Sequence, residues 1–322
     1  MPSRRLVLVA IDHASDVDRI IRVAAGYDGA STDVDVIRVV PHRTVQVDVG
    51  RGRGALDPHD DRTAGLGARL ASMAQPAAQG ARLRNVRLRG APERVIPAYA
   101  RLHQAILLVV ESGFGSSRLW PHGGVVEELA RRSPVPVLVV PKRAAPELDE
   151  DRPRRIVAAI NFSIASVVAL RTAIDLARGS GSRLTLVHAL NEVPRHMVFS
   201  GSEAWEASRR LPGQADVVAG RLRRHASVLG ADDVDTAVMT GAADRAILEV
   251  AAQRQADIVI IGVPRRGWID RMAFGSTLRR VLRRATTAVL VVPVTAGAEP
   301  LPVVEQMHSR LWMGRTLDRV AA

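Results

Sequence analysis

A strand, a loop and a helix follow one another within residues 257–293, and their glycines and hydroxyl side chains suit phosphate binding. Gly262 ends a continuous apolar run at 258–261, and Gly275-Ser276-Thr277 opens the helix. A glycine at the end of a strand lets another backbone or a ligand approach closely. The first turn of a helix offers unpaired N–H groups and the positive end of the helix dipole, which both favour a phosphate. Ser276 and Thr277 equally suit a helix cap, so the pattern alone leaves both interpretations open.

The elements that position this loop belong to a unit that the chain contains twice. Residues 4–12 resemble residues 154–161, residues 134–141 resemble residues 286–293, and Gly90-Ala91-Pro92 resembles Gly241-Ala242-Ala243. Two copies of one unit of about 140 residues are therefore predicted. We assign residues 1–143 to the first domain, 144–153 to a linker, 154–294 to the second domain and 295–322 to a C-terminal tail.

Strands and helices alternate within each copy. In the second copy the apolar patterns predict strands at 156–160, 183–190, 234–239, 258–261 and 288–292, and helices at 166–178, 216–229, 244–254 and 277–284. This alternation predicts an α/β fold with doubly wound parallel sheets. Ligands of such sheets bind beyond the carboxyl ends of the strands. Asn161, Ala189, Gly241 and Gly262 all lie at the ends of predicted strands, so they should converge there.

The composition limits the classes of function. The chain has 322 residues, 47% of them hydrophobic, no cysteine and a formal net charge of +12. Without cysteine it has no disulfides, thiolate zinc sites or cysteine nucleophiles. Lys142 is the only lysine among 45 basic residues, so we attribute the arginine excess to genome base composition. With only 3% aromatic residues, binding of nucleic acid is the weaker alternative. No apolar run is long enough to span a bilayer, so we expect a cytoplasmic protein with no membrane partner.

These features together resemble the universal stress protein family, as a tandem member with two UspA-like domains. The resemblance rests on the RRIVAAINFS opening, the Gly-x-x-Glu/Asp-Arg segment before the third helix, the Val-Leu-Val-Val-Pro strand and the glycine motif, and it covers nearly all of residues 3–294. It implies flavodoxin-like five-stranded sheets of strand order 3-2-1-4-5. It also implies that the apolar strands at 137–140 and 289–292 pair, here within the chain as an intramolecular pseudo-dimer. A further homodimer through edge strands stays open.

The resemblance also implies ATP binding in one subclass of the family, whose motif is Gly-x2-Gly-x9-Gly-Ser/Thr. The second copy keeps this spacing but has Arg265 in place of the second glycine and Asn161 in place of the aspartate after the first strand. Asparagine retains an acceptor oxygen and adds a donor, so we expect it to be tolerated. Arg265 either blocks the phosphate position or holds phosphate bidentately, and both interpretations stay open. The expected nucleotide-binding residues are Ala159, Asn161, Ala189, Gly241, Ile261, Gly262, Arg265, Arg266, Gly275, Ser276 and Thr277.

The first copy predicts only a weak second site. It keeps Asp12 after the first strand, but Val110 stands where the second copy has Gly262. Gly113, Gly123 and Gly124 remain, while the hydroxyl residues are missing, so phosphate would meet backbone groups alone. We therefore interpret the first copy as degenerate and structural.

The leading functional hypothesis is a stress-response protein whose second domain binds ATP or another adenine nucleotide, with or without Mg²⁺. The alternative is a nucleotide-free signalling or scaffold protein of the other subclass. No general base stands beside a nucleophile and the nine histidines show no metal-ligand spacing, so at most slow ATP hydrolysis is expected. His188 is interpreted as structural. The arginines at 279–284 are interpreted as a solvated helix face.

Two further segments carry apolar residues without a clear role. Residues 191–214, which include Met197, Phe199 and Trp205, are interpreted as a surface loop docked on the sheet edge in preference to a cover over a ligand. For the tail at 295–322, docking on its own domain and an oligomer contact are both open.

Overall fold

The computed structural model describes residues 5–12, 15–26, 32–40, 83–115, 124–142, 155–190, 201–264 and 274–294. The first half of the chain contributes β1 (Arg5–Ile11), α1 (Val17–Gly26), β2 (Thr32–Val40), β3 (Leu83–Arg89), α3 (Pro92–Leu102), β4 (Leu107–Glu111), α4 (Val125–Arg132) and β5 (Val137–Val140). The second half contributes β6 (Arg155–Ala159), α5 (Ile164–Ser180), β7 (Arg183–Leu190), α6 (Gly201–Val228), β8 (Asp235–Thr240), α7 (Ala243–Gln253), β9 (Ile258–Val263), α8 (Phe274–Arg284) and β10 (Ala288–Pro293).

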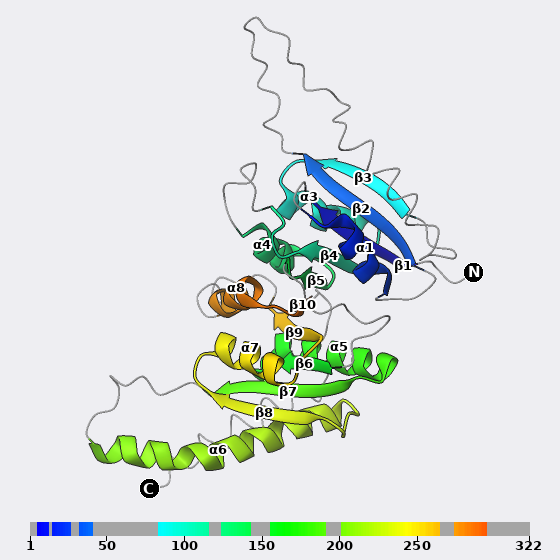
Figure 1. Ribbon diagram of the computed structural model, residues 1–322. Helices are drawn as coiled ribbons and strands as arrows, with labels where there is room; N and C mark the ends of the chain where they lie inside the picture. The colour runs from blue at the N-terminus through cyan, green and yellow to red at the C-terminus, as the bar shows by residue number, and fades with distance from the viewer. Residues whose placement is uncertain are drawn as a thin grey trace, which may run out of the picture.

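The strands of both halves form one continuous sheet of order β3-β2-β1-β4-β5-β10-β9-β6-β7-β8 (Figure 1). Within each half the neighbouring strands are parallel and follow the order 3-2-1-4-5, which confirms the predicted fold. The halves meet where β5 pairs with β10 in the antiparallel sense, with Leu138 opposite Leu290. The expected pseudo-dimer within one chain is therefore present.

This pairing bears on how the chain could assemble with a second copy. β5 and β10 lie at the centre of the sheet, each hydrogen-bonded on both sides, so neither is free to pair with a second chain. The strands at the two ends of the described sheet are β3 and β8. A homodimer through the strands at 137–140 and 289–292 would have to break the pairing inside the chain.

Helices cover both faces of the sheet and create two apolar cores. One core contains buried residues of α1, α5 and α6, among them Ile20, Leu170 and Leu222. The other contains buried residues of α3, α4, α7 and α8, among them Ile96 and Val281. The central strands are apolar on both faces because both faces are covered, as is usual for parallel sheets. Figure 1 shows these two groups of helices on opposite sides of the strands.

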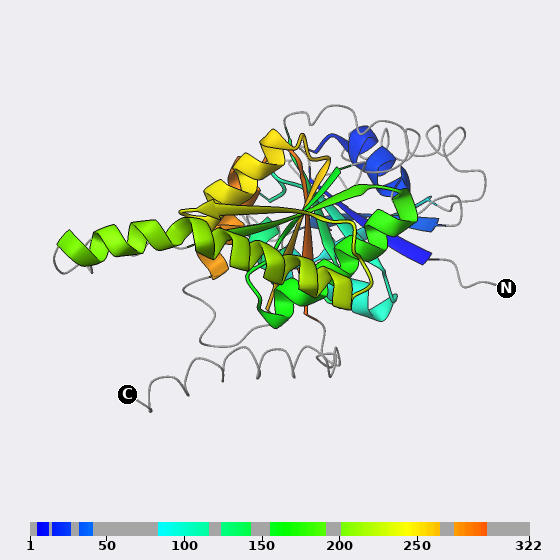
Figure 2. The same cartoon turned by 90° about the horizontal axis from the view of Figure 1, so that it is seen from below.

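The longest helix begins earlier than the sequence predicted. α6 spans 28 residues from Gly201, whereas the predicted start was residue 216. Residues 201–214 are therefore helical and not a loop; Trp205 lies in this helix, while Met197 and Phe199 lie outside the described residues. Figure 2 shows the yellow-green α6 crossing the end of the sheet and extending beyond it.

Candidate functional site

The carboxyl ends of β6, β7, β8 and β9 bring most of the predicted site residues to one edge of the sheet (Figure 1). Ala159 ends β6 and pairs with Ile261 of β9, and Gly262 follows in the same strand. Ala189 lies near the end of β7, and the N–H of Gly241 donates to Leu190 O at 2.9 Å. Gly275, Ser276 and Thr277 lie at the start of α8. Arg265 and Arg266 lie outside the described residues.

Asn161 lies exposed immediately beyond β6 and forms a tight turn with Ser163. Its Oδ1 accepts the Ser163 N–H at 3.1 Å and the Ser163 hydroxyl at 2.7 Å. The Ser163 Oγ in turn accepts the Ser166 N–H at 3.2 Å, so Ser163 caps α5. The turn therefore fixes Asn161 relative to the helix that follows.

Gly262 allows a close approach, but the approaching group is a protein backbone. A Cβ built on Gly262 would lie 2.0 Å from Ala165 O and 3.0 Å from Ser166 N, both in the first turn of α5. Any side chain here would push α5 off the sheet. The sequence left a ligand and a backbone as alternatives at this glycine, and the described contact is with the backbone of α5.

An aromatic and cationic cluster that the sequence did not indicate lies beside this edge. Phe162 has a φ of +61° and packs against His188 of β7 and His225 of α6, with ring centroids 5.0 and 5.2 Å apart. The Arg221 guanidinium lies 4.0 Å from the Phe162 ring centroid, a cation–π distance. Each histidine bonds through Nδ1 to a backbone carbonyl, His188 to Ile160 O at 2.7 Å and His225 to Arg221 O at 2.9 Å.

Burial lowers the pKa of both histidines below the ordinary value. For His188 the bond to Ile160 O opposes this effect, while the charge of Arg221 adds to it. For His225 the bond to Arg221 O opposes it, and the charges of Arg221 and Arg224 add to it. His188 thus has a structural role, as expected, but together with α6 and not alone. The four residues of this cluster come from two elements, β7 and α6, and from the turn before α5, so no local spacing could reveal it.

In the first copy, the equivalent edge is held by bonds within the protein. Asp12 Oδ1 accepts the Ser15 hydroxyl at 3.0 Å, and Asp12 Oδ2 accepts the Gly115 N–H at 2.9 Å. Both carboxylate oxygens therefore have protein donors, one of them from the turn after β4. Gly113 lies in that turn beside the Lys142 side chain, Gly124 caps α4, and Gly123 lies outside the described residues.

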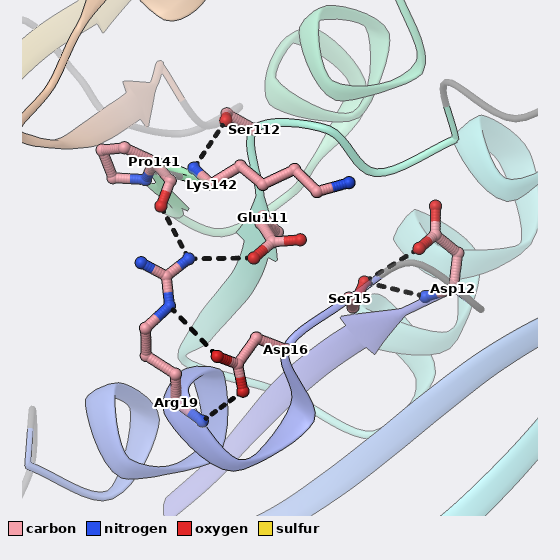
Figure 3. Close-up of polar contacts among 8 residues, drawn as sticks. All are labelled: Asp12, Ser15, Asp16, Arg19, Glu111, Ser112, Pro141 and Lys142. Carbon is pink, nitrogen blue, oxygen red and sulfur yellow. Dashed lines mark hydrogen bonds and ion pairs between the residues drawn. The ribbon is translucent and has the colours of Figure 1, made fainter. Parts of the chain in front are cut away.

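A buried ion pair lies beside Asp12 at the same edge (Figure 3). Arg19 of α1 binds Glu111 Oε1 at 2.9 Å and also donates to Pro141 O at 2.6 Å. The Glu111 side chain is only 2% exposed. The pair joins α1 to the ends of β4 and β5, and it occupies the edge with protein groups. This supports the structural interpretation of the first copy.

The strand register corrects the predicted equivalence of Val110 and Gly262. Ala10 and Ala159 hold the same position in their repeats, and they pair with Val110 and Ile261 respectively. Glu111, not Val110, therefore stands where the second copy has Gly262. The predicted equivalence was wrong by one residue because the two copies differ in the length of the segment between their last two strands. Residue 108 pairs with residue 137 in the first copy, whereas residue 259 pairs with residue 289 in the second.

The four arginines of α8 are all exposed, as predicted, but two of them also form ion pairs. Asp244, which is buried at the start of α7, forms ion pairs with Arg280 at 3.0 Å and Arg284 at 3.5 Å. No ion pair is found for Arg279 or Arg283 within the described residues. Two of the four arginines thus join α7 to α8, which leaves less positive charge for an acidic partner.

Neither a metal cluster nor a membrane-spanning helix is present in the described part of the chain. No group of three or more histidine, aspartate or glutamate side chains there could hold a metal ion. No described helix is both long and apolar enough to cross a membrane.

Comparison with known proteins agrees with the sheet order and the repeat. A sequence model of the Universal stress protein family matches residues 3–141 and again 153–293. A universal stress protein from Thermus aquaticus is 30% identical over 117 residues, which are 36% of this chain and 81% of that protein. The crystal structure of a universal stress protein from Archaeoglobus fulgidus is similar with a TM-score of 0.66 at 18% identity, over 92% of this chain and 98% of that chain. A functionally unknown protein from Pseudomonas aeruginosa PAO1 is similar with a TM-score of 0.60 at 17% identity, over 97% and 98%. With its two family domains and one shared sheet, this chain belongs to the universal stress protein family.

Proposed function

We propose that the second half of the chain binds an adenine nucleotide at the carboxyl ends of β6, β7 and β9. The observation that carries the proposal is the contrast between the two copies at this edge. In the first copy the edge is occupied by Asp12 and Glu111 with their protein partners. In the second copy the same positions hold Asn161, whose side chain is exposed, and Gly262, which has none. Among the described residues, the second copy thus lacks the carboxylates that occupy this edge in the first copy, which supports a ligand position beside Asn161.

The proposed roles follow from position along the edge. Asn161 and Ala189 face the base and the ribose, with Ala159, Ile261 and Gly241 as neighbouring backbone. Gly275, Ser276 and Thr277 offer N–H groups, hydroxyls and the positive end of the α8 dipole to the phosphates. Arg265 and Arg266 follow β9 in the sequence and would assist there, and a bound Mg²⁺ would accompany a triphosphate. Gly262 acts indirectly, because it seats α5 and thereby Asn161.

The first copy is proposed to bind no nucleotide. A ligand there would have to displace the Gly115 N–H from Asp12 and separate the Arg19–Glu111 pair, which is buried on its carboxylate side. Separating a buried ion pair costs about 3–5 kcal/mol, which offsets much of the affinity of a small ligand. We therefore expect one nucleotide per chain.

The alternative function is that of a nucleotide-free signalling or scaffold protein. One observation favours it, namely the presence of Arg265 where the ATP-binding members have glycine. The two functions differ in a direct binding measurement.

The test is calorimetric titration of ATP, ADP and AMP into nucleotide-stripped protein. We expect saturable binding with a stoichiometry near one, and about tenfold weaker binding of ATP by Thr277→Val, because a hydrogen bond to a charged group contributes roughly 1.5–3 kcal/mol. Thr287→Val is the matched control: the Thr287 hydroxyl donates to Ala256 O at the opposite end of the sheet, so this variant should bind as the wild type does. Absence of binding at millimolar ATP would favour the scaffold function. Equal losses in both variants would place the ligand elsewhere.

A further inference from the structure

Two hydrogen bonds from Ser163 determine which end of the Asn161 side-chain amide points outward. A backbone N–H can only donate, so the atom that accepts the Ser163 N–H at 3.1 Å must be the amide oxygen. The Ser163 hydroxyl, 2.7 Å away, donates to the same oxygen. The amide orientation is thus determined by the hydrogen bonds and not by choice.

The amide nitrogen is what remains for a ligand. Asn161 is exposed, and its Nδ2 makes no hydrogen bond to any residue within the described ranges. The amide therefore presents two N–H donors outward, while its oxygen is already occupied by Ser163. An aspartate in the same turn would present a carboxylate oxygen outward, which is an acceptor.

We propose that Asn161 is a specificity-determining residue that donates a hydrogen bond to an acceptor atom of the bound nucleotide. This inference rests on the proposed function of the same edge. It reverses the polarity that an aspartate would have there. The facing ligand atom is then a ring nitrogen, a sugar oxygen or a phosphate oxygen, and not the exocyclic amine of adenine, which only donates.

The first copy provides an internal comparison. There Asp12 uses both oxygens as acceptors, one for the Ser15 hydroxyl and one for the Gly115 N–H. In the first copy the protein itself thus supplies the donors for both carboxylate oxygens of Asp12. The oxygen of Asn161 already accepts two bonds from Ser163, so the asparagine offers no second acceptor like that of Asp12. It turns a donor toward the proposed ligand position instead.

Asn161→Asp tests the inference with little change of shape. A carboxylate can still accept both bonds from Ser163, so the turn and the cap of α5 are kept, and only the outward donor is lost. Adenosine and AMP are titrated into the wild type and into this variant. We expect at least about tenfold weaker binding of both ligands, because a donor is lost and an acceptor is left facing an acceptor. Asn85→Asp, an exposed change on β3, introduces the same charge far from the edge and should bind as the wild type does.

The two ligands separate the effect of the donor from that of charge. Adenosine carries no phosphate, so repulsion between carboxylate and phosphate cannot explain a loss of its affinity. Weaker binding of AMP alone, or unchanged or tighter binding of adenosine, would overturn the inference while leaving the proposed function intact. Failure of the wild type to bind either ligand would instead overturn the proposed function, and the inference with it. A thermal melt of each variant checks that α5 remains folded.

Discussion

A single buried carboxylate, Asp35, organises the polar contacts at the β3 end of the sheet. Its oxygens accept bonds from Arg84 at 2.7 and 3.0 Å and from the Tyr99 hydroxyl at 2.8 Å. Burial, followed by the bond to Asp35, raises the pKa of Tyr99 to about 12. An unfolded tyrosine loses its proton near pH 10. The folded state therefore binds this proton more tightly, and the stabilisation present below pH 10 is lost as the pH rises from about 10 to about 12.

Tyr99→Phe should remove this dependence. At pH 7 we expect a free energy of unfolding lower by roughly 1–3 kcal/mol, because buried Asp35 loses a donor. Denaturant unfolding at pH 7 measures that loss. The raised pKa itself is read from tyrosinate absorbance in a Tyr27→Phe background, since the chain has only two tyrosines. Titration of Tyr99 near pH 10 in the folded protein would contradict both its burial and its bond to Asp35.

For single residues, the sequence predicted where a residue lies along its strand better than which groups its side chain or backbone contacts. Asn161 follows the first strand of its repeat as predicted, but its free donor depends on the Ser163 bonds, which spacing does not reveal. Gly262 was predicted to permit a close approach, but only the packing of α5 shows which group approaches. Asp35 and Glu111 carried a signal that was not used: each is a charged residue within or just after an apolar run, where burial requires a partner.

Among the elements, α6 contacts the end of the sheet partly through two histidines that pack on Phe162, in addition to its buried apolar residues. His188 and His225 flank Phe162, and the facing charged groups identified around them are Arg221 and Arg224. Because both pKa values are lowered, the unfolded chain takes up protons at a higher pH than the folded chain does. The contribution of these two histidines to stability is therefore fully present above pH 6.5 and is lost as the pH falls below it.

Replacing both rings should weaken this acid sensitivity. Asparagine can donate to the same carbonyls without gaining charge, so His188→Asn with His225→Asn should lose less free energy of unfolding between pH 7 and pH 5 than the wild type loses. Urea denaturation at both pH values gives the comparison. His103→Asn, an exposed change on the other half of the chain, is the control and should keep the wild-type dependence. An equal dependence in the double variant and the wild type would place the acid sensitivity elsewhere.

The predicted elements agree best where a pattern is continuous. Strands β7 and β10 match their predicted spans to within one residue, because uninterrupted apolar runs specify buried strands. α6 begins at Gly201 and not at the predicted residue 216, although it contains Pro212-Gly213, a helix-breaking pair; Glu203, Ala204 and Arg210 favour a helix. Local propensity thus conflicted with a breaker signal, and the structure follows the propensity.

On the scale of the whole molecule, the two repeats behave as one sheet because β5 and β10 are joined. The sequence and its family resemblance predicted that these strands pair. They could not predict the register, because strands buried on both faces lack the alternation that fixes one. The structure places Val137, Leu138 and Val139 opposite Val291, Leu290 and Val289. Each repeat therefore covers the strand edge that the other would expose.

This seam should couple the stabilities of the two halves, and a double-mutant cycle measures that coupling. Leu138 and Leu290 are 1% and 2% exposed and lie directly opposite each other. We expect Leu138→Ala and Leu290→Ala each to cost about 2–5 kcal/mol, with an interaction energy of about 0.5–3 kcal/mol in the double variant, because neighbours share one packing site. Leu138→Ala combined with Leu184→Ala, a buried residue of β7 that is separated from β5 by three strands, should be additive within about 0.5 kcal/mol. Additivity of the seam pair would mean that the repeats fold side by side without sharing a core. Coupling confined to that pair would instead show that one sheet, and not two independent domains, holds α5 and the edge beside it in place.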